Sequence, residues 1–445
     1  MDDLKLTASQ QKAYDALLRG ENVFLTGGAG TGKTTLIKKF IKEVDPCCAH
    51  TLLAAPTGKA ALNMSVETEE GTIYGSTVHR LFGLKAEAIP EYRGAVPKIF
   101  RGADRIIIDE ISMMRMDVFD YVSDVLLDVI GDIDRALSNR RKFQIILVGD
   151  FFQLPPVLKT QAAGGASDKE VLDAKYGEDI GKAYCFQSYS WDLLEIRKYE
   201  LTEIMRQKDD AEFCEALNKI RKGDASGITY INQHYDKSRF IPDRPTLCGT
   251  NRNAMKINNM MLARNPNPKK IYEWKVETNS KYISGYLKNL QCSERLTLCA
   301  GAQVISIANT ETAVNGQIGR VESVHDDFVV VTWTDGQTSK VLPYEWEITR
   351  QDIIKIGNKV KIASVPILTV TQLPLKLAYA FTIHKAQGET LKRANIILDT
   401  FETGHLYTAL SRCESVENMR LQRPLKKSDV LCDETINKWY ERQEA

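Results

Sequence analysis

A glycine-rich turn that ends in a lysine and a hydroxyl is the stretch of the sequence best suited to chemistry. An apolar run precedes it and a helical pattern follows it, which is the strand–turn–helix context of a phosphate-binding loop. Its glycines let backbone N–H groups surround phosphate oxygens, Lys33 can reach the β- and γ-phosphates, and the Thr34 hydroxyl can hold Mg²⁺. The residues expected to bind a nucleoside triphosphate are Gly27, Gly28, Ala29, Gly30, Thr31, Gly32, Lys33, Thr34 and Thr35.

Two neighbouring carboxylates close a second apolar run, residues 105–108, which predicts a buried strand. Asp109 can bind Mg²⁺, and Glu110 can accept the proton of the water that attacks the γ-phosphate. A third run, residues 145–148, also predicts a buried strand and precedes Gln153, whose amide is placed where it could sense that phosphate. Because they belong to the same predicted domain as the phosphate loop, these three residues are expected to bind the metal and to act in catalysis.

Two arginines further along the chain could complete such a site. Arg206 and Arg412 each follow a short segment that turns from apolar to polar. An arginine that reaches the γ-phosphate across a cleft accelerates phosphoryl transfer by about 10³- to 10⁵-fold and makes closure depend on the nucleotide. Taken singly, each arginine is more often part of a surface ion pair.

Several other polar residues leave two interpretations open. Gln10 is either an exposed amide or a reader of the donor and acceptor edge of adenine, with equal weight. Thr57 and Lys59 follow the strand-like residues 51–55 in a Pro-Thr-Gly turn, at the sheet edge where α/β proteins bind ligands, although a solvated turn is the alternative. His79, seen alone, is more often structural than functional.

The elements that must position these residues divide the chain into an α/β arrangement. Strands alternate with helices over residues 1–190, with a small excursion at 63–100, and predict a parallel-sheet domain. A second α/β unit is predicted at 191–258 and 367–445. Residues 259–366 change to short alternating strands with hairpin signals at 315–316 and 335–336, which predicts a small antiparallel barrel inserted in the second unit.

Composition excludes several classes of protein. Lys and Arg number 59 and Asp and Glu 58, so the net charge of +1 leaves any nucleic-acid partner to a local groove. No apolar run reaches the length of a membrane span, and the first residues do not resemble a signal peptide. The nine cysteines lack metal or disulfide spacing and suit a reducing compartment. Residues 159–181 predict a surface insertion or mobile loop.

Together, these motifs resemble those of the Pif family, in the 5′-to-3′ branch of the superfamily one helicases. The resemblance covers nearly the whole chain. It rests on Gln10 and on residues 27–34, 55–61, 77–79, 108–113, 149–157, 201–207, 382–388 and 409–412. One departure stands out: residues 140–145 lack the Phe-Gly-Gly turn that family members usually carry there, which leaves the subfamily open.

The resemblance implies an ATP- and Mg²⁺-dependent DNA helicase with two RecA-like parallel-sheet domains. It further implies a wedge insertion in the first domain and a Src-homology-three-like barrel in the second. The implied catalytic residues are Lys33, Glu110, Gln153, Arg206 and Arg412, with Thr34 and Asp109 for the metal and Gln10 and Gly388 for the nucleotide. The implied DNA-binding residues are Thr57, Lys59, His79, Asn251, Thr382, His384 and Lys385.

The implied partners are single-stranded DNA and forked, tailed or quadruplex DNA, bound by a monomer without a membrane. The implied compartment is the cytoplasm, with the nucleoid in a bacterium, and the implied processes are DNA repair, recombination and telomere maintenance. Three alternatives remain open from the residues. The chain could be an ATP-driven switch or loader that does not translocate, a binding module with a vestigial ATPase, or a motor that acts on RNA.

Overall fold

The structure, a computed structural model, describes residues 5–84, 90–136, 143–158, 167–206, 210–236, 244–278, 287, 290, 292–356, 359–388 and 390–443. Contacts divide the chain into two compact units. The first is Met1–Arg239 with Ile383–Ala445, and the second is Phe240–Thr382. These bounds differ from the three-part division expected from the sequence, which stays a prediction.

The first unit is built on one sheet whose described pairings are parallel. The sheet contains, in spatial order, β5 (Ser76–Thr77), β2 (Thr51–Ala55), β6 (Arg105–Ile108), β7 (Gln144–Val148), β1 (Val23–Gly27) and β8 (Arg197–Leu201). β1 lies between β7 and β8, and β6 lies between β2 and β7. The predicted strands at 51–55, 105–108 and 145–148 are therefore confirmed, and their carboxyl ends share one edge.

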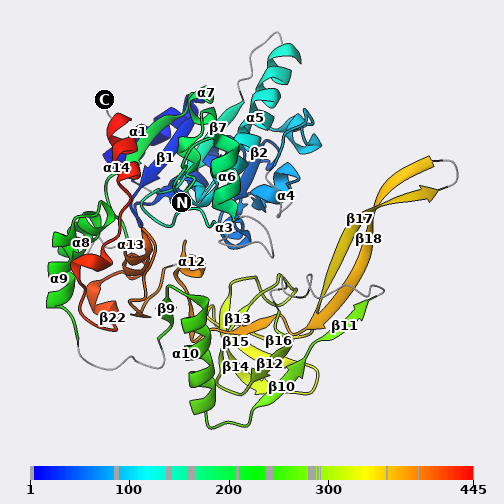
Figure 1. Cartoon of the computed structure of the whole chain (residues 1–445), viewed down its shortest axis with the longest axis vertical. Coiled ribbons are helices and arrows are strands. Elements are labelled where there is room, and N and C mark those ends of the chain that lie inside the picture. The colour runs from blue at the N-terminus through cyan, green and yellow to red at the C-terminus, as the bar shows by residue number, and fades with distance from the viewer. Residues whose placement is uncertain are drawn as a thin grey trace. The chain divides into compact units, whose positions relative to one another are not determined.

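Successive residues of these strands face two different cores, as strand geometry requires. On β6, Ile106 and Ile108 pack with α4 (Val78–Phe82), α5 (Met116–Ala136) and α14 (Glu434–Arg442). Ile107 instead packs with α1 (Ala8–Leu18) and α2 (Lys33–Val44). The sheet is thus covered by helices on both faces, which is why its strands are apolar throughout. Figure 1 shows the red C-terminal α14 beside β1, and the Phe24 and Trp439 rings lie 5.8 Å apart.

The excursion at 63–100 returns to the main sheet. α3 (Gly58–Asn63) leads into it, the antiparallel pair β3 (Val66–Glu67) and β4 (Thr72–Ile73) follows, and the 3₁₀ turn η1 (Lys98–Gly102) begins at its end. β5 pairs in parallel with β2, so this segment supplies the strand next to β2 in the main sheet. Residues 85–89 of the excursion lie outside the described residues.

A helix occupies part of the stretch expected to be a loop. α6 (Asp168–Tyr176) begins with a capping box in which Ser167 and Glu170 satisfy each other's backbone N–H groups. The Ser-x-x-Glu spacing is visible in the sequence and could have predicted this start. Residues 159–166 of the same stretch lie outside the described residues, so the expectation of a mobile loop there is not tested.

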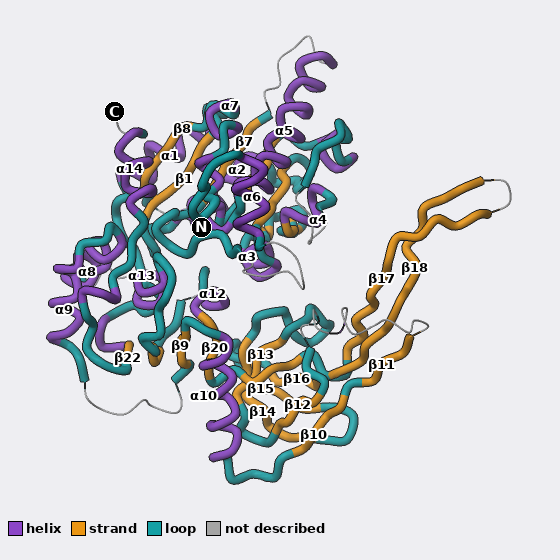
Figure 2. Tube along the Cα trace, viewed as in Figure 1, coloured by secondary structure: helices purple, strands orange, loops and turns teal. Residues whose placement is uncertain are grey.

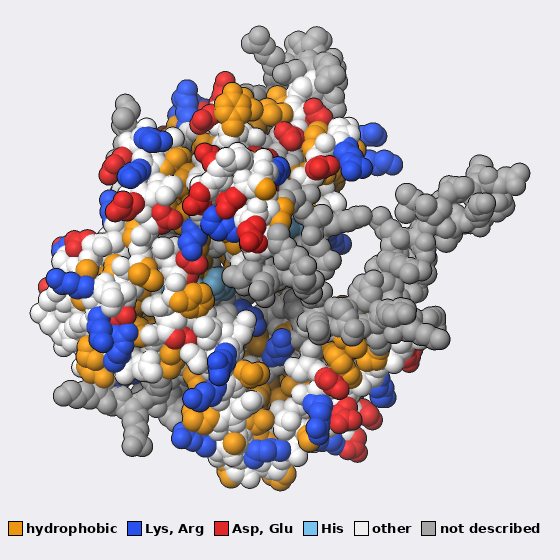
Figure 3. Space-filling view, in the orientation of Figure 1, with side chains coloured by type: hydrophobic (Ala, Val, Ile, Leu, Met, Phe, Trp, Pro, Cys, Tyr) orange, Lys and Arg blue, Asp and Glu red, His pale blue; other side chains and the backbone are white. Residues whose placement is uncertain are grey.

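Further helices, 3₁₀ turns and strands complete the first unit. They are η2 (Ile111–Met113), η3 (Cys185–Gln187), α7 (Ser190–Leu193), α8 (Ala211–Arg221), η4 (Ala225–Gly227), α9 (Ile228–Gln233), α12 (Ile383–Ala386), β21 (Ala394–Ile396), α13 (His405–Leu410), η5 (Val416–Asn418), β22 (Met419–Leu421) and η6 (Lys427–Asp429). β21 and β22 pair in parallel. Side chains of both charges are interspersed over the face of this unit in Figure 3, in keeping with the small net charge.

The second unit is mainly made of strands, as Figure 2 shows, with α10 (Asn251–Arg264) as its long helix. Its strands are β9 (Thr246–Cys248), β10 (Lys270–Glu273), β11 (Lys275–Thr278), β12 (Arg295–Leu298), β13 (Gln303–Ser306), β14 (Ile318–Val324), β15 (Val329–Trp333), β16 (Thr338–Val341), β17 (Tyr344–Ile356), β18 (Lys359–Gln372), β19 (Leu375–Leu377) and β20 (Ala380–Thr382). β9 and β20 pair in parallel.

The antiparallel strands form three sheets within this unit. β16, β15, β14, β13 and β19 are neighbours in the largest, β10 pairs with β12, and β11, β18 and β17 form the third. Their core includes Val304, Val331 and Trp333. The predicted hairpin at 335–336 is confirmed, because Gly336 has a left-handed backbone in the short connection between the paired strands β15 and β16. Residues 315–316 instead lie at the end of the longer connection 307–317, which joins the paired strands β13 and β14. Whether these sheets form the expected barrel stays a prediction.

Among the described helices of both units, none is long and apolar enough to cross a membrane.

Candidate active site

The phosphate loop is a tight turn between β1 and α2, with the first turn of α2 supplying Lys33, Thr34 and Thr35. Gly32 caps the helix with a left-handed backbone (φ 84°), and a Cβ there would lie 2.9 Å from the Gln10 amide nitrogen. Only glycine satisfies both constraints without strain. The loop therefore presents backbone N–H groups at the start of a twelve-residue helix, where the helix dipole favours an anion.

The Lys33 ammonium lies over this loop. Its Nζ donates to the carbonyl oxygens of Gly27, at 2.8 Å, and Gly28, at 3.0 Å. Burial lowers the Lys33 pKa from its ordinary value, while the negative charges of Asp150 and Glu110 oppose that shift. The side chain is thus a cation held among carbonyl and carboxylate oxygens, where a phosphate would relieve its desolvation.

Gln10 is buried rather than exposed, with 7% of its surface accessible. Its Oε1 accepts from the Thr7 backbone N–H at 3.1 Å as part of the α1 capping box, and its Nε2 donates to the Thr31 carbonyl at 3.0 Å. The structure therefore does not support the exposed-amide interpretation. Each end of the amide keeps further hydrogen-bonding capacity, so the adenine-reading role stays a prediction.

The two carboxylates follow β6 at the same edge. Asp109 is 8% exposed and accepts from the Glu110 backbone N–H at 2.9 Å. Burial and the neighbouring charge of Glu110 raise the Asp109 pKa well above its usual value, against the attraction of Lys33. Glu110 itself has a left-handed backbone (φ 51°), an uncommon conformation for a residue with a side chain. Such strain is often found at functional sites.

Glu110 is held by a residue that the sequence analysis did not single out. The Gln387 Nε2 donates to the Glu110 Oε2 at 2.9 Å, across 277 residues of sequence. Gln387 follows α12 and is 8% exposed, and Gly388 comes next with φ 79°. The segment predicted to contact DNA and phosphate thus lies against the predicted general base.

The two candidate arginines belong to the same compact unit as the phosphate loop. The Arg206 backbone N–H donates to the Gly30 carbonyl at 3.2 Å, and its Nη1 donates to the Ser411 carbonyl at 3.0 Å. Arg412 is 2% exposed, and its Nη2 lies 3.4 Å from the Gln153 Oε1. A chain of contacts therefore joins the phosphate loop, Arg206, the 411–412 segment and Gln153.

α13 and the Gln153 segment approach each other closely. A Cβ on Gly404, which precedes α13 with φ 74°, would lie 1.9 Å from the Gln153 carbonyl oxygen. A side chain at this position would push the two segments apart. Gly404 is therefore needed to hold Arg412 against Gln153, and the sequence shows this need only as an unremarkable glycine before a short helix.

A buried ion pair was also missed by the sequence analysis. The Arg221 guanidinium, at the end of α8, contacts the Asp150 carboxylate at 2.9 Å, and their side chains are 4% and 0% exposed. Arg221 also contacts Glu200 at 3.2 Å and lies over the Phe152 ring. The sequence does indicate this pair, because Arg221 is spaced to lie on the apolar face of α8 with Phe213 and Leu217. A charged side chain on such a face is expected to have a buried partner of opposite charge.

Removing one member of this pair should be costly. Arg221→Met is expected to destabilise the first unit by about 3–5 kcal/mol, because it leaves the Asp150 carboxylate buried without its cation. Thermal and urea unfolding of the whole chain measure the loss. Lys219→Met is the matched control, since Lys219 lies on the same helix and its ion pair with Glu215 is exposed, worth about 0–1 kcal/mol. Equal losses in the two variants would contradict the prediction.

The predicted DNA-binding residues fall in both units. In the first unit, Thr57 caps α3 by accepting from the Ala60 N–H, and Lys59 lies in α3, although its side chain is outside the described residues. His79, in α4, is half-buried, and burial lowers its pKa. His384 and Lys385 lie in α12, where burial also lowers the His384 pKa and Lys385 is exposed.

The other two predicted DNA-binding residues belong to the second unit. Asn251 begins α10 and is exposed, whereas Thr382 ends β20 and is only 6% exposed. A hydroxyl this well covered offers little surface to a ligand. The exposure of Asn251 and Lys385 suits contact with a strand better than that of Thr382 does.

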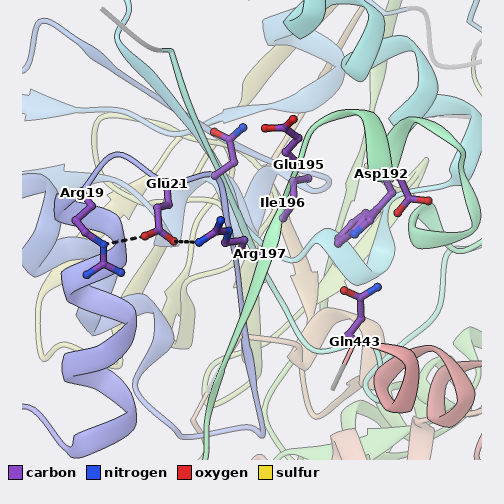
Figure 4. A pocket seen from close by; sticks show the side chains of 9 residues that line it. Arg19, Glu21, Asp192, Glu195, Ile196, Arg197 and Gln443 are labelled. Carbon is purple, nitrogen blue, oxygen red and sulfur yellow. Dashed lines mark hydrogen bonds and ion pairs between the residues drawn. The ribbon is translucent and has the colours of Figure 1, made fainter. Parts of the chain in front are cut away.

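A hollow of about 770 Å³ lies away from these residues, at the start of β1 rather than at its carboxyl end. Figure 4 shows its lining, in which Glu21 lies between Arg19 and Arg197. The lining residues are Arg19, Glu21, Asn22, Trp191, Asp192, Glu195, Ile196, Arg197 and Gln443. It contains no predicted site residue, and its arginines already face a carboxylate.

Comparison with known proteins gives consistent similarities. A family model described as an AAA domain matches residues 10–159. The ATP-dependent DNA helicase Pif1 of Bdellovibrio bacteriovorus is 30% identical over 94% of this chain and 88% of its own length. The ATP-dependent DNA helicase PIF1 of Xenopus laevis is also 30% identical, and the chain spans 61% of that relative's length.

A solved structure of a Bacteroides Pif1 helicase, in complex with ADP-AlF3 and single-stranded DNA, matches with a TM-score of 0.77. It is 28% identical, and the match covers 99% of this chain and 98% of that one. Together with the parallel sheets, this similarity indicates two RecA-like α/β domains.

Proposed function

The chain belongs to the Pif1 family of ATP-dependent DNA helicases, and on that premise we propose that it moves along single-stranded DNA in the 5′-to-3′ direction. ATP hydrolysis drives this movement and unwinds duplex or structured DNA. The observation that carries the proposal is the gathering of Lys33, Glu110, Gln153, Arg206 and Arg412 around one phosphate loop.

Each of these residues has a role in hydrolysis that its surroundings support. The Lys33 ammonium neutralises charge on the β- and γ-phosphates. Glu110 accepts the proton of the attacking water, and the hydrogen bond from Gln387 orients its carboxylate. Arg206 and Arg412 stabilise the charge of the transferring phosphoryl group, with Gln153 positioned against Arg412. Gln10 and Gly388 complete the nucleotide site on the adenine and phosphate sides.

A divalent cation suits the residues at this edge of the sheet. Thr34 and Asp109 offer the hydroxyl and carboxylate oxygens that Mg²⁺ prefers, and burial of Asp109 disfavours its charge unless a cation lies near. Bound Mg²⁺ would neutralise phosphate charge during transfer. In this proposal the two protein ligands hold the cation while the remaining residues act on water and phosphate.

Binding of DNA is assigned to residues that meet the sugar–phosphate backbone rather than the bases. The proposed contacts are Thr57, Lys59, His79, Asn251, His384 and Lys385, with Thr382 as a contact only where the covering residues move aside. Hydroxyl and cationic groups position a strand without reading its sequence. We also propose that residues 63–100 act as a wedge, that residues 259–366 form a Src-homology-three-like accessory barrel, and that a monomer acts on tailed, forked or quadruplex DNA.

Unwinding of duplexes that carry a single-stranded tail on one side tests the proposal. With ATP and Mg²⁺, we expect strand displacement from 5′-tailed and not from 3′-tailed substrates. Lys33→Ala should lose both ATP hydrolysis and strand displacement, because Lys33 is the one lysine or arginine of the phosphate loop, residues 27–34.

Four other results would each change a part of the proposal. DNA-stimulated hydrolysis without displacement from either tail would indicate a switch or loader. Strand displacement from 3′-tailed substrates would reverse the proposed direction of movement. Equal stimulation of ATP hydrolysis by RNA and DNA would add RNA to the substrates. ATP hydrolysis by Lys33→Ala at the rate of the parent protein would show that residues 27–34 are not the loop that binds the phosphates of ATP.

A further inference from the structure

A tyrosine hydroxyl lies on the phosphate loop. Tyr407, in α13, is 4% exposed, and its hydroxyl accepts a hydrogen bond from the Ala29 backbone N–H at 2.7 Å. A Cβ built on Gly28 would lie 3.3 Å from the same oxygen. The Tyr407 side chain therefore reaches into the turn whose N–H groups are proposed to bind phosphate, from a helix 378 residues further along the chain.

The same hydroxyl has a second partner. It donates to the Asp150 Oδ2 at 3.3 Å, and Asp150 in turn binds Arg221. A phenol has one proton and two lone pairs, so it can donate to Asp150 and accept from Ala29 at the same time. Burial and the charge of Asp150 raise the Tyr407 pKa far above its ordinary value, so the hydroxyl keeps that proton at neutral pH.

The Ala29 N–H cannot give a full hydrogen bond to two acceptors. A phosphate oxygen cradled by the loop would need the donor that the Tyr407 oxygen uses. We propose that Tyr407 is a latch on the phosphate loop, whose hydroxyl competes with nucleotide phosphate for the Ala29 N–H. The inference rests on the proposed nucleotide role of the loop and adds a residue that sets its affinity.

The latch also links the loop to Arg412. The Ser411 N–H donates to the Tyr407 carbonyl at 3.0 Å, and the Arg412 Nε donates to the Thr408 carbonyl at 2.9 Å. Loss of the Tyr407–Ala29 hydrogen bond when phosphate binds therefore acts on the helix that positions Arg412. Thermodynamic coupling between two sites is reciprocal. Any change at Arg412 that disfavours the hydrogen bond between Tyr407 and Ala29 therefore also favours phosphate binding.

Tyr407→Phe tests the latch, because it removes the hydroxyl and keeps the buried ring. Without the hydroxyl, the Ala29 N–H loses the acceptor that it has among the described residues, and phosphate no longer competes with Tyr407 for this donor. Titration with a fluorescent ADP, displaced by pyrophosphate or adenosine, measures affinity in the absence of DNA. We expect about 3- to 10-fold tighter binding of ADP and pyrophosphate, and unchanged binding of adenosine, which carries no phosphate.

Tyr184→Phe is the matched control. Tyr184 is 1% exposed, and its hydroxyl lies 3.3 Å from the Asp433 carboxylate, the same distance as in the Tyr407–Asp150 contact. Its affinity for ADP should equal that of the parent protein. Unchanged or weaker binding of ADP and pyrophosphate by Tyr407→Phe would overturn the latch, whereas failure of the parent protein to bind either ligand would overturn the proposed function instead.

A second measurement keeps the Tyr407 hydroxyl in place and therefore applies even if the Tyr407→Phe variant does not fold. With 3-fluorotyrosine placed at position 407, the ¹⁹F resonance should shift as pyrophosphate is added, because the hydroxyl loses its Ala29 partner. A resonance that stays constant while pyrophosphate displaces the fluorescent ADP would overturn the latch.

Discussion

Arg412→Ala is expected to bind ATP within about threefold of the parent affinity and to hydrolyse it about 10³- to 10⁵-fold more slowly in the presence of single-stranded DNA. The guanidinium lies against Gln153 and is almost completely buried, so a charge that develops on a γ-phosphate at the proposed site would meet little screening by water. Steady-state hydrolysis and equilibrium nucleotide binding, measured on the same preparation, separate the two effects.

The burial of Arg412 demands a control for folding. Its Nε donates to the Thr408 carbonyl and its Nη2 to the Ser411 hydroxyl, so truncation leaves acceptors behind. Arg412→Lys keeps the positive charge without the planar fork and should restore stability better than turnover. Arg197→Ala, at an exposed position of β8, should leave both unchanged. A normal rate for Arg412→Ala would remove this residue from the proposed catalytic set.

The parts of the site that lie within one short segment could be predicted from the sequence. The loop at 27–34 is defined by adjacent residues, and glycine, lysine and threonine at that spacing leave few other structures. The carboxylates after β6 and Gln153 after β7 follow from apolar strands whose ends share an edge. The hairpin of β15 and β16 likewise follows from the Asp335-Gly336 turn signal between two alternating strands.

Contacts between distant segments could not be predicted in this way. The Tyr407 hydroxyl and the Gln387 amide reach their partners only because α13 and α12 lie against the first sheet's edge. The α14 helix, at the end of the chain, packs against the first sheet rather than staying with the neighbouring 390–421 segment. No local period encodes such a choice, since any amphipathic helix can cover any apolar face of matching size.

Tertiary context also decided how polar residues are used. Gln10 had two interpretations of equal weight, and burial beneath Thr31 excluded one of them. Arg221 carries no motif, yet it forms the buried pair with Asp150, next to the hydroxyl of Tyr407. A single sequence identifies residues able to do chemistry more readily than the residues that hold them in place.

Glu110→Gln is expected to lower DNA-stimulated hydrolysis by about 10²- to 10⁴-fold, the usual contribution of a general base. The substitution removes the proton acceptor and keeps the shape of the side chain. In the parent protein, the Gln387 Nε2 donates a hydrogen bond to the Glu110 Oε2 at 2.9 Å. The amide oxygen of the variant can accept the same hydrogen bond, so the site should stay assembled. Single-turnover hydrolysis measures the chemical step without product release.

The expected signature is a protein that still binds ATP and single-stranded DNA but rarely completes hydrolysis. Glu43→Gln is the control, because Glu43 accepts from Tyr14 near the far end of α2 and loses the same charge away from the loop. Its turnover should match that of the parent protein. If Glu110→Gln turned over within about threefold of the parent rate, the attacking water would not transfer its proton to Glu110 in the rate-limiting step. Gln387 would then hold Glu110 for binding or closure and not for catalysis.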